Sequence, residues 1–350
     1  MENVSKNVVF IAFQDGDSFK KHLEKQRFQI CYFPFNHKAD RIKKLVQYWK
    51  LINFLKKFKP DFLIPYVAES NKIVAQIWKY SGASFAFWNQ REEGRKLYGT
   101  PHEKKLIYNV SAVVSNSFEG KNALMRTYGL TSDQIQVINN GIIPYSEQFA
   151  SKDWNRELNI HADRPLISMI ANITDRKDHT TLIQAWRIVI DTCKNSGKVL
   201  PFLVMAGRKD NMYDTLRLIS FDLRLSDHIA FVGALNPVQD LIERSHFCVF
   251  SSNLEGCPNG VLECMERGKA VVGTNISGVR QALGDKFSEV CLSEANNPND
   301  LAIKILNLYN NPELVSEIGS YNYKRIINEF SVEKMAHAHL ALIEDKMRIN

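Results

Sequence analysis

Long apolar runs are missing from this chain of 350 residues, and its six cysteines lack any metal-binding spacing. No run approaches the length of about 20 residues that a membrane-spanning helix needs, and the first residues lack the basic and apolar segments of a signal peptide. The absence of CxxC or CxxxxC spacing argues against a zinc site and favours buried thiols in a reducing compartment. We therefore expect a cytoplasmic protein, which could also lie peripherally on the cytosolic face of a membrane.

Acidic residues are scarce at the start of the chain. Residues 1–60 contain 13 Lys and Arg against 5 Asp and Glu, a net charge of +8, whereas the whole chain carries +7. Much of the excess lies in residues 40–59, where apolar side chains recur at helical spacing between lysines. Two interpretations stay open, a domain helix with a solvated basic face and a helix that contacts an anionic membrane. A nucleic-acid partner is not expected, because no DNA- or RNA-binding motif accompanies the charge.

Short apolar runs alternate with helical patterns along most of the chain. With 45% hydrophobic and 24% charged residues, the chain is long enough for two cores of ordinary size. We predict an α/β protein with two Rossmann-like, doubly wound parallel sheets. Strands of the first sheet are expected at residues 8–13, 28–33, 61–66, 84–88, 112–114 and 136–138. Helices are expected at about residues 17–25, 40–58, 70–80, 101–109 and 118–128.

The predicted domain limits are residues 1–145 and 146–330. A linker is expected near residues 143–154, and the alternation of strand and helix begins again near residue 166. A last segment with helical periodicity predicts a terminal helix within residues 331–350.

The most informative segment is residues 251–283, in which Glu255 and Glu263 flank seven residues that include two glycines and a proline. The apolar run at 246–250 predicts a buried parallel strand, and residues 261–267 predict a short helix after a tight turn. Ligands of doubly wound sheets bind outside the carboxyl ends of the strands, where helix amino termini present free N–H groups. An ionised carboxylate can accept two vicinal hydroxyls at once, which suits a sugar or a ribose.

This segment resembles the nucleotide-binding signature of family 4 glycosyltransferases, retaining enzymes of the GT-B fold among the glycosyl transferases of group 1. The likeness covers roughly residue 60 to the end, and several other stretches agree with it in order. They are AVVSNS at 112–117, IQVINNGI at 135–142, MIANITDRKDH at 169–179, FLVMAGR at 202–208 and IAFVGAL at 229–235. The resemblance implies two domains that face each other across a cleft, with the helix at 331–350 completing the first domain.

The resemblance also implies an activity and its residues. The enzyme would transfer a sugar from a nucleoside-diphosphate sugar, most simply UDP- or GDP-linked, to a glycan or lipid-linked acceptor in polysaccharide or glycoconjugate biosynthesis. The catalytic roles would fall to Glu255, Lys177 and Arg176. The donor nucleotide would contact Glu263, Asn259, Gly260, Val261, Gly207, Arg208 and Val232. On the acceptor side, Gln90 and Arg91 are the candidates.

Neither a metal nor a separate cofactor is implied. There is no DxD-like acidic cluster near the basic loop at 171–178, and lysine or arginine can replace a divalent ion at a departing diphosphate. The two glutamates need no altered pKa to accept hydroxyl groups. We expect His179 to be a packing residue at the start of a helix.

The sequence departs from the family pattern in three places. Thr174 stands where an arginine is usual, so diphosphate contacts are expected to shift to Arg176. The acceptor-side histidine after the strand at 84–88 is replaced by the polar cluster at 89–93. A glycine-rich loop after the first strand is absent, so residues 8–33 align better with the family's second strand and the unit after it. Alternatively, residues 8–13 take the central position in a shortened domain.

Two other functional classes stay open beside the transferase. A non-catalytic or weakened partner subunit that binds a nucleotide sugar is suggested by Thr174 and by the short amino-terminal part. A dinucleotide-dependent oxidoreductase is compatible with the alternation of strands and helices, but no GxGxxG turn supports it. A sugar-nucleotide epimerase is less favoured than either.

Overall fold

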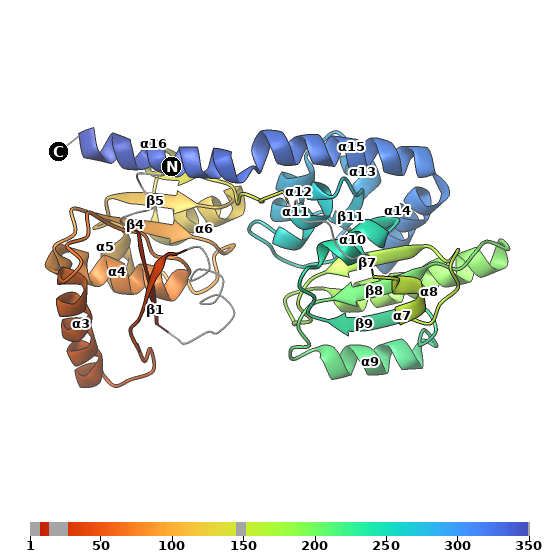
Figure 1. The fold of residues 1–350 in the computed structure, drawn as a ribbon, viewed down its shortest axis with the longest axis horizontal. Coiled ribbons are helices and arrows are strands. Elements are labelled where there is room, and N and C mark those ends of the chain that lie inside the picture. The colour runs from red at the N-terminus through yellow and green to blue at the C-terminus, as the bar shows by residue number, and fades with distance from the viewer. Residues whose placement is uncertain (1–7, 14–26, 145–151, 349–350) are drawn as a thin grey trace. The chain divides into compact units, whose positions relative to one another are not determined.

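The computed structural model describes residues 8–13, 27–144 and 152–348, shown in Figure 1. The chain divides into two compact units, one of residues 1–88 and 100–112 and the other of residues 89–99 and 113–350. The domain limits that the sequence predicts, near residues 145 and 330, stay a prediction. The helix expected at 17–25 and part of the expected linker lie outside the described residues.

The described residues of the smaller unit contain the first strands and three helices. Strand β1 (Val9–Ala12) pairs in parallel with β2 (Gln29–Tyr32), and β3 (Phe62–Leu63) pairs in parallel with β4 (Phe85–Gln90). The helices are α3 (Arg41–Lys56), α4 (Ala68–Ser81) and α5 (Pro101–Ile107). A small core of apolar side chains joins α3, α4 and the segment after β2; its buried members are Phe35, Leu51, Leu55, Ile73 and Ile77.

The described residues of the first part of the chain form two sheets rather than one. Strands β1 and β2 make a two-stranded sheet, and a four-stranded sheet has the order β3-β4-β5-β6, with β5 at Ala112–Ser115 and β6 at Ile135–Val137. A doubly wound sheet has the strand order 3-2-1-4-5-6. Among the described residues β1 pairs with β2, and no ladder joins β1 to β3. Both placements of residues 8–13, at the second strand or at the centre of a shortened domain, stay predictions.

The larger unit contains a six-stranded parallel sheet with the order β12-β11-β10-β7-β8-β9. In chain order this is the complete 3-2-1-4-5-6 arrangement. The strands are β7 (Leu166–Ile170), β8 (Phe202–Ala206), β9 (Ile229–Gly233), β10 (Phe247–Phe250), β11 (Val271–Thr274) and β12 (Leu292–Ser293). Every residue of β7, β8, β10 and β11 is buried, which is why these strands are continuous apolar runs in the sequence.

Helices connect the strands of the larger unit, and several have clear start signals. Helix α8 (His179–Asn195) begins after Asp178, whose carboxylate accepts the Thr181 N–H at 3.1 Å. The other helices are α6 (Phe118–Tyr128), α7 (Trp154–Glu157), α9 (Tyr213–Asp222), α10 (Gln239–Arg244), α11 (Asn259–Glu266), α12 (Ser277–Leu283), α13 (Ser288–Cys291), α14 (Pro298–Asn310), α15 (Pro312–Glu329) and α16 (Val332–Arg348). A 3-10 turn at Ser132–Gln134 precedes β6.

The terminal helix that the periodicity predicts is α16. The backbone N–H of Ile142 donates to the Phe330 carbonyl at 2.8 Å, and a Cβ on Gly141 would lie 2.5 Å from the Cα atom of Val332. The chain between α15 and α16 therefore packs directly on residues 141–142. Residue 141 has no room for a side chain because of this close approach.

The described residues bear on three points of the sequence analysis: the cysteines, metal ligands and membrane-spanning helices. All six cysteines are free thiols, and four of them are buried. Within the described residues, no three or more His, Cys, Asp and Glu side chains are grouped so that they could hold a metal ion. No helix in the described part of the chain combines the length and the apolar character needed to cross a bilayer.

The buried indole of Trp186 provides a test of this fold. Its Nε1–H donates to the His228 carbonyl at 3.1 Å, and the side chain is fully buried in the core of the larger unit. We expect Trp186→Phe to lower the free energy of unfolding by about 1–3 kcal/mol, because the hydrogen bond is lost and a void remains. Urea denaturation followed by circular dichroism measures the effect.

The matched control is Trp49→Phe, because Trp49 is 65% exposed on α3. That substitution should leave the urea transition unchanged. Equal stability of the Trp186 variant and the wild-type protein would contradict the packing described here.

Candidate functional site

The order of the six-stranded sheet reverses between β7 and β10. At such a switch point the loops after the two adjacent strands leave the sheet in opposite directions and open a crevice at the carboxyl ends. The loop after β7 is residues 171–178, and the loop after β10 is residues 251–258. These two loops contain Arg176, Lys177 and Glu255, the three residues to which the resemblance assigns catalytic roles.

The loop after β7 is fixed by hydrogen bonds to the loops on both sides. The N–H of Ile173 donates to the Arg208 carbonyl at 2.9 Å, and the Arg208 N–H donates to Oδ1 of Asn172 at 3.0 Å. On the other side, the Asp178 N–H donates to the Ser251 carbonyl at 3.1 Å. A Cβ on Gly207 would lie only 2.0 Å from the carbonyl oxygen at 171, so a glycine is required there. The backbone of this loop is therefore held in place before any ligand binds.

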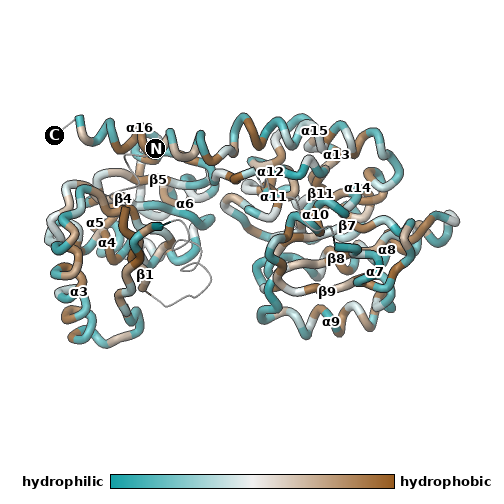
Figure 2. Tube along the Cα trace, in the orientation of Figure 1, coloured by the Kyte–Doolittle hydropathy of each residue, from teal (hydrophilic) through white to brown (hydrophobic). Residues whose placement is uncertain are grey.

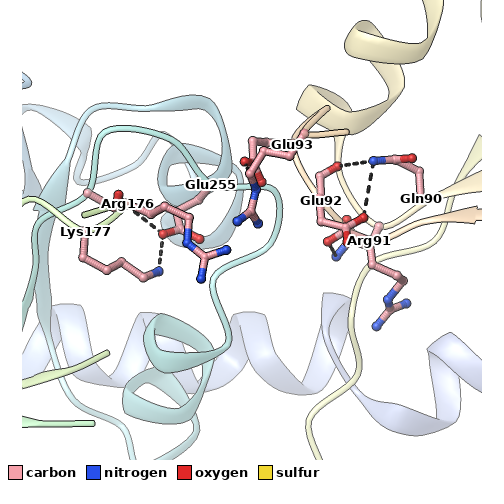
Figure 3. Close-up of polar contacts among 10 residues, drawn as sticks. Gln90, Arg91, Glu92, Glu93, Arg176, Lys177 and Glu255 are labelled. Atoms are coloured by element: carbon pink, nitrogen blue, oxygen red, sulfur yellow. Dashed lines mark hydrogen bonds and ion pairs between the residues drawn. The ribbon is translucent and has the colours of Figure 1, made fainter. Parts of the chain in front are cut away.

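Lys177 and Glu255 form an ion pair across the switch point, drawn in Figure 3. Their side chains are only 18% and 15% exposed. The Ser252 hydroxyl donates to Oε1 of Glu255 at 2.7 Å, and the Lys177 ammonium lies 4.7 Å from the ring centre of Phe250. The structure thus brings together two of the three residues to which the resemblance assigns catalytic roles.

The third such residue, Arg176, differs from the nearby cations in its exposure. Arg176 is exposed, and no described residue pairs with its guanidinium, whereas Thr174 is buried at 6% exposure. Arg208 also lies at the surface and makes an ion pair with Asp210 at 3.4 Å. The guanidinium of Arg176 is therefore the more available of the two for an anionic ligand.

Helix α11 begins at the same edge of the sheet. Its N-cap residue, Pro258, provides no side-chain cap, and the Pro258 carbonyl accepts the Val261 N–H at 3.0 Å, so the N–H groups of Asn259 and Gly260 receive no capping oxygen from the described residues. A Cβ on Gly260 would lie 2.1 Å from the Ile170 carbonyl oxygen, so the helix start lies directly against the end of β7. The positive end of the helix dipole adds to this site for an anion. Val261 is fully buried, and its role is packing.

Glu263, on the second turn of α11, has an altered pKa. Burial, with the nearby charge of Glu266 as a smaller cause, raises the pKa of Glu263 to about 7 from the ordinary value of 4.5. Glu266 itself forms an ion pair with Arg267 at 2.7 Å. Acceptance of hydroxyl groups needs no altered pKa, so the raised pKa of Glu263 is a feature that the sequence did not indicate. No hydrogen bond or ion pair within the described residues joins Glu263 to the Lys177–Glu255 pair.

A chain of asparagine amides supports the start of α11, and the sequence analysis missed it. Nδ2 of Asn140 donates to Oδ1 of Asn259 at 2.8 Å and approaches the Cys257 carbonyl at 3.4 Å. Oδ1 of Asn140 accepts from Nδ2 of Asn116 at 3.2 Å. Asn140 belongs to the Asn-Asn-Gly run before the predicted linker, which was the only signal for it in the sequence. Asn259 therefore contacts other protein groups through its side chain.

The remaining predicted residues lie in different surroundings. Val232 is partly buried in β9. Gln90 is fully buried at the end of β4, and its amide donates to the Glu92 carbonyl at 3.0 Å, as Figure 3 shows. The Arg91 carbonyl accepts from the amide of Asn116 at 3.1 Å. The acceptor role of Gln90 and Arg91 stays a prediction.

His179 lies at the first position of α8, and both of its ring nitrogens lack a hydrogen-bond partner among the described residues. Burial, with the charge of Lys177 as a smaller cause, lowers the pKa of His179 to about 4. The imidazole is therefore neutral at pH 7 and acts as a packing group, in line with the expectation from the sequence.

The raised pKa of Glu263 leads to a prediction about stability. Because its pKa is higher in the folded protein than in the unfolded chain, ionisation of Glu263 favours unfolding, and this penalty develops as pH rises from about 4.5 to about 7. We expect Glu263→Gln to raise the free energy of unfolding by about 1–3 kcal/mol at pH 8 and to change it little at pH 4. Urea denaturation at both pH values measures the difference.

Glu313→Gln, at an exposed position of α15, is the matched control and should show no such rise at pH 8. A Glu263→Gln variant that is no more stable than the wild-type protein at pH 8 would contradict the raised pKa.

Comparison with known proteins gives several relatives. A glycosyltransferase of unknown function from Methanocaldococcus jannaschii is 36% identical over 109 residues, which are 31% of this chain and 30% of that protein. The N,N'-diacetylbacillosaminyl-diphospho-undecaprenol alpha-1,3-N-acetylgalactosaminyltransferase of Campylobacter jejuni is 23% identical over 318 residues, which cover 86% of this chain and 81% of that enzyme. The residues that match therefore cover less than a third of the length of the first relative and most of the length of the second.

Solved structures share the fold at low sequence identity. HepE of Anabaena, crystallised with UDP and glucose, has a TM-score of 0.82 at 16% identity, with 98% of this chain and 93% of that chain covered. A glycosyltransferase of Rickettsia africae has a TM-score of 0.80 at 19% identity, with 98% and 90% covered. The family model for glycosyl transferases group 1 matches residues 150–325, which contain the six-stranded sheet and the switch-point loops. The chain is therefore a glycosyltransferase with the GT-B fold and belongs to the glycosyl transferases of group 1.

Proposed function

We propose that this protein is a retaining glycosyltransferase that moves a sugar from a nucleoside-diphosphate sugar to a glycan or lipid-linked acceptor, in polysaccharide or glycoconjugate biosynthesis. The observation that carries the proposal is the Lys177–Glu255 ion pair at the switch point, beside the start of α11. A cation, a carboxylate and a helix amino terminus at one edge of the sheet match the diphosphate and the hydroxyl groups of such a donor.

Each part of the donor has a candidate partner. The diphosphate would contact the Lys177 ammonium, the exposed guanidinium of Arg176 and the first N–H groups of α11. The hydroxyls of the donor sugar would bind Glu255, which the Ser252 hydroxyl already orients at 2.7 Å. The ribose hydroxyls would bind Glu263. Because its pKa is about 7 in the protein, hydroxyl donation from the ribose would favour the ionised form and lower that pKa on binding.

The chemical step follows from these contacts. The bond between the anomeric carbon and the diphosphate oxygen breaks, and the acceptor oxygen attacks the same face of the sugar. The proton of the acceptor hydroxyl passes to the departing diphosphate, so retention needs no separate base. Negative charge that develops on the leaving diphosphate would be stabilised by Lys177 and Arg176, without a metal ion or another cofactor.

Two comparisons support the choice of donor and acceptor tests. The HepE structure contains UDP and glucose, which favours UDP-sugars as the first donors to examine. The name of the Campylobacter relative specifies an acceptor saccharide carried on diphospho-undecaprenol, which favours lipid-linked acceptors.

Donor binding is predicted to depend on Glu263 and on pH. Calorimetric titration of the full-length protein with UDP, GDP, ADP and their common sugars should show saturable binding of one nucleotide. We expect Glu263→Ala to weaken that binding by roughly 1–3 kcal/mol, because the ribose loses a charged hydrogen-bond acceptor. Affinity of the wild-type protein should rise between pH 6 and pH 8 as Glu263 ionises, and this rise should be absent in the variant.

Glu313→Ala controls for the general effect of removing a carboxylate. Unchanged affinity in a folded Glu263→Ala protein would remove the ribose role. Saturable binding without transfer to any acceptor or hydrolysis of the donor would favour the alternative of a nucleotide-sugar-binding partner subunit, for which the buried Thr174 is the supporting observation.

Helix α3 supports a peripheral contact with an anionic membrane. Its sequence contains five basic residues and no acidic residue. One face packs into the core through Leu51 and Leu55, and a second apolar face is open to solvent.

We name this second face the α3 stripe; its residues are Ile42, Leu45, Val46 and Trp49, which are 46% to 73% exposed. In Figure 2 hydrophobic and hydrophilic segments recur along α3. An apolar face between lysines fits the interface of a membrane with anionic headgroups.

The contact is tested by flotation with vesicles of phosphatidylcholine and phosphatidylglycerol. The double variant Leu45→Ser, Trp49→Ser should bind at least about tenfold more weakly, because each inserted apolar side chain contributes on the order of 1 kcal/mol or more. Binding of the wild-type protein should also weaken at high salt and on vesicles without phosphatidylglycerol.

The matched control is Leu218→Ser, Phe221→Ser on α9, where the two side chains are 65% and 70% exposed. That variant should bind like the wild-type protein. If both double variants lose binding equally, the contact is not specific to the α3 stripe and the membrane proposal fails.

A further inference from the structure

The smaller unit contains a pocket of about 240 Å3 that none of the donor contacts uses. Its walls come from four segments: the chain after β2, the first half of α3, α4 as far as Gln76, and α5 with the residue before it. Helices α3, α4 and α5 follow strands β2, β3 and β4 in the chain. The first turns of these helices contribute Lys44, Glu69 and His102, and they follow the carboxyl ends of parallel strands, the edge where doubly wound sheets bind ligands.

Polar side chains line the pocket, and several are already oriented by one another. Lys72 and Glu103 form an ion pair at 2.6 Å, with side chains only 16% and 8% exposed. Nε2 of His102 lies 3.2 Å from Oε1 of Gln76. Burial, with the charge of Glu69 as a smaller cause, raises the pKa of Tyr48, so its hydroxyl stays protonated. The pocket therefore presents hydrogen-bond donors and acceptors in fixed positions.

The charges of the lining decide which ligand class fits. Lys44 and Lys72 are balanced by Glu69 and Glu103, so the lining carries no net charge when its histidines are neutral. A free phosphate would meet two carboxylates, which disfavours an anion site. Sugar hydroxyls both donate and accept hydrogen bonds, and they suit a lining of mixed amide, hydroxyl, ammonium and carboxylate groups.

Shape and apolar surface agree with this choice. The volume is below the roughly 300–1,000 Å3 that is typical of sites for drug-sized ligands, so the pocket suits one sugar ring better than an oligosaccharide. The rings of Phe35 and Tyr48, with centroids 5.4 Å apart, contribute an aromatic wall for the C–H face of a sugar. A ring bound there could have both its hydroxyls and its apolar face in contact with protein.

Helix α3 connects this pocket with the α3 stripe. Lys44 and Tyr48 line the pocket, and the adjacent residues Leu45 and Trp49 belong to the stripe. A sugar in the pocket would thus lie within one helix width of the surface for which we propose membrane contact. A saccharide carried on a lipid could reach that position while its lipid stays in the bilayer.

We propose that this pocket binds one sugar ring of the acceptor glycan and holds it beside the membrane-facing helix α3. The proposal rests on the transferase function proposed above and adds a binding site for the acceptor. It assigns the recognition of sugar hydroxyls to Gln76, Tyr48 and the Lys72–Glu103 pair.

The experiment uses full-length protein saturated with UDP, so that soluble sugars cannot report on the donor site. The probes are the methyl glycosides of glucose, galactose, N-acetylglucosamine and N-acetylgalactosamine, detected by saturation-transfer difference NMR. At least one glycoside should bind the wild-type protein. Gln76→Leu and Tyr48→Phe should each weaken it by about tenfold, the loss expected when a bound hydroxyl loses a buried polar partner. These variants leave the Lys72–Glu103 pair intact, which protects the fold.

The control is Tyr80→Phe, because Tyr80 is 67% exposed on the same helix as Gln76. It should bind the glycoside like the wild-type protein. Equal binding by the pocket variants, binding of no glycoside, or displacement of the glycoside by inorganic phosphate would each overturn the proposal. Titration of every variant with UDP, GDP and ADP separates this result from the donor proposal. A protein that binds none of the three nucleotides contradicts the donor proposal, and the glycoside test can still be run without nucleotide.

Discussion

Helix α11 approaches strand β7 so closely that residue 260 has no room for a side chain. A Cβ there would lie 2.1 Å from the Ile170 carbonyl oxygen, well inside van der Waals contact. This approach places the positive end of α11 at the switch point of the sheet, next to the loop that carries Lys177. The candidate donor site depends on this arrangement, because the helix start, the lysine and Glu255 would otherwise not share one edge.

Hydrogen bonds between loops keep that edge in shape. The loop after β7 is bound to the loops after β8 and β10, and the amide of Asn140 connects Asn259 with Asn116. Buried amides are costly to leave unpaired, so this chain of asparagines favours one position of the α11 start. Preorganised donors around a departing diphosphate are what transfer of a glycosyl group needs, because they need no rearrangement as charge develops.

Much of the fold was predictable because parallel strands buried on both faces leave continuous apolar runs. The runs at β7, β8 and β10, and the helix after Gly260, could be recognised for that reason. The sequence could place Lys177 and Glu255 at the same edge of the sheet, because both follow strands that end there. It could not predict that the two side chains form an ion pair. The division of the first part of the chain into two sheets was not predictable, because pairing depends on which strands lie side by side.

Other features required the packed structure. The pKa of Glu263 depends on burial and on Glu266, three positions along one helix, and neither effect can be judged from the spacing alone. Apolar periodicity in residues 40–59 predicted a helix, but it could not separate the face that packs on the core from the exposed face with Trp49. The amide of Asn140 donates to Asn259, more than a hundred residues further along the chain, and no local pattern reveals this contact.

Hydrogen–deuterium exchange of the full-length protein, with and without saturating UDP, tests the central claim most directly. A donor at the switch point should slow exchange in peptides that cover residues 171–179 and 255–263, because these loops and the start of α11 would contact the diphosphate and ribose. An equal concentration of uridine should leave exchange at residues 171–179 unchanged, because uridine lacks the diphosphate that this basic loop would contact. Slowed exchange confined to other segments, with these two unchanged, would contradict the account.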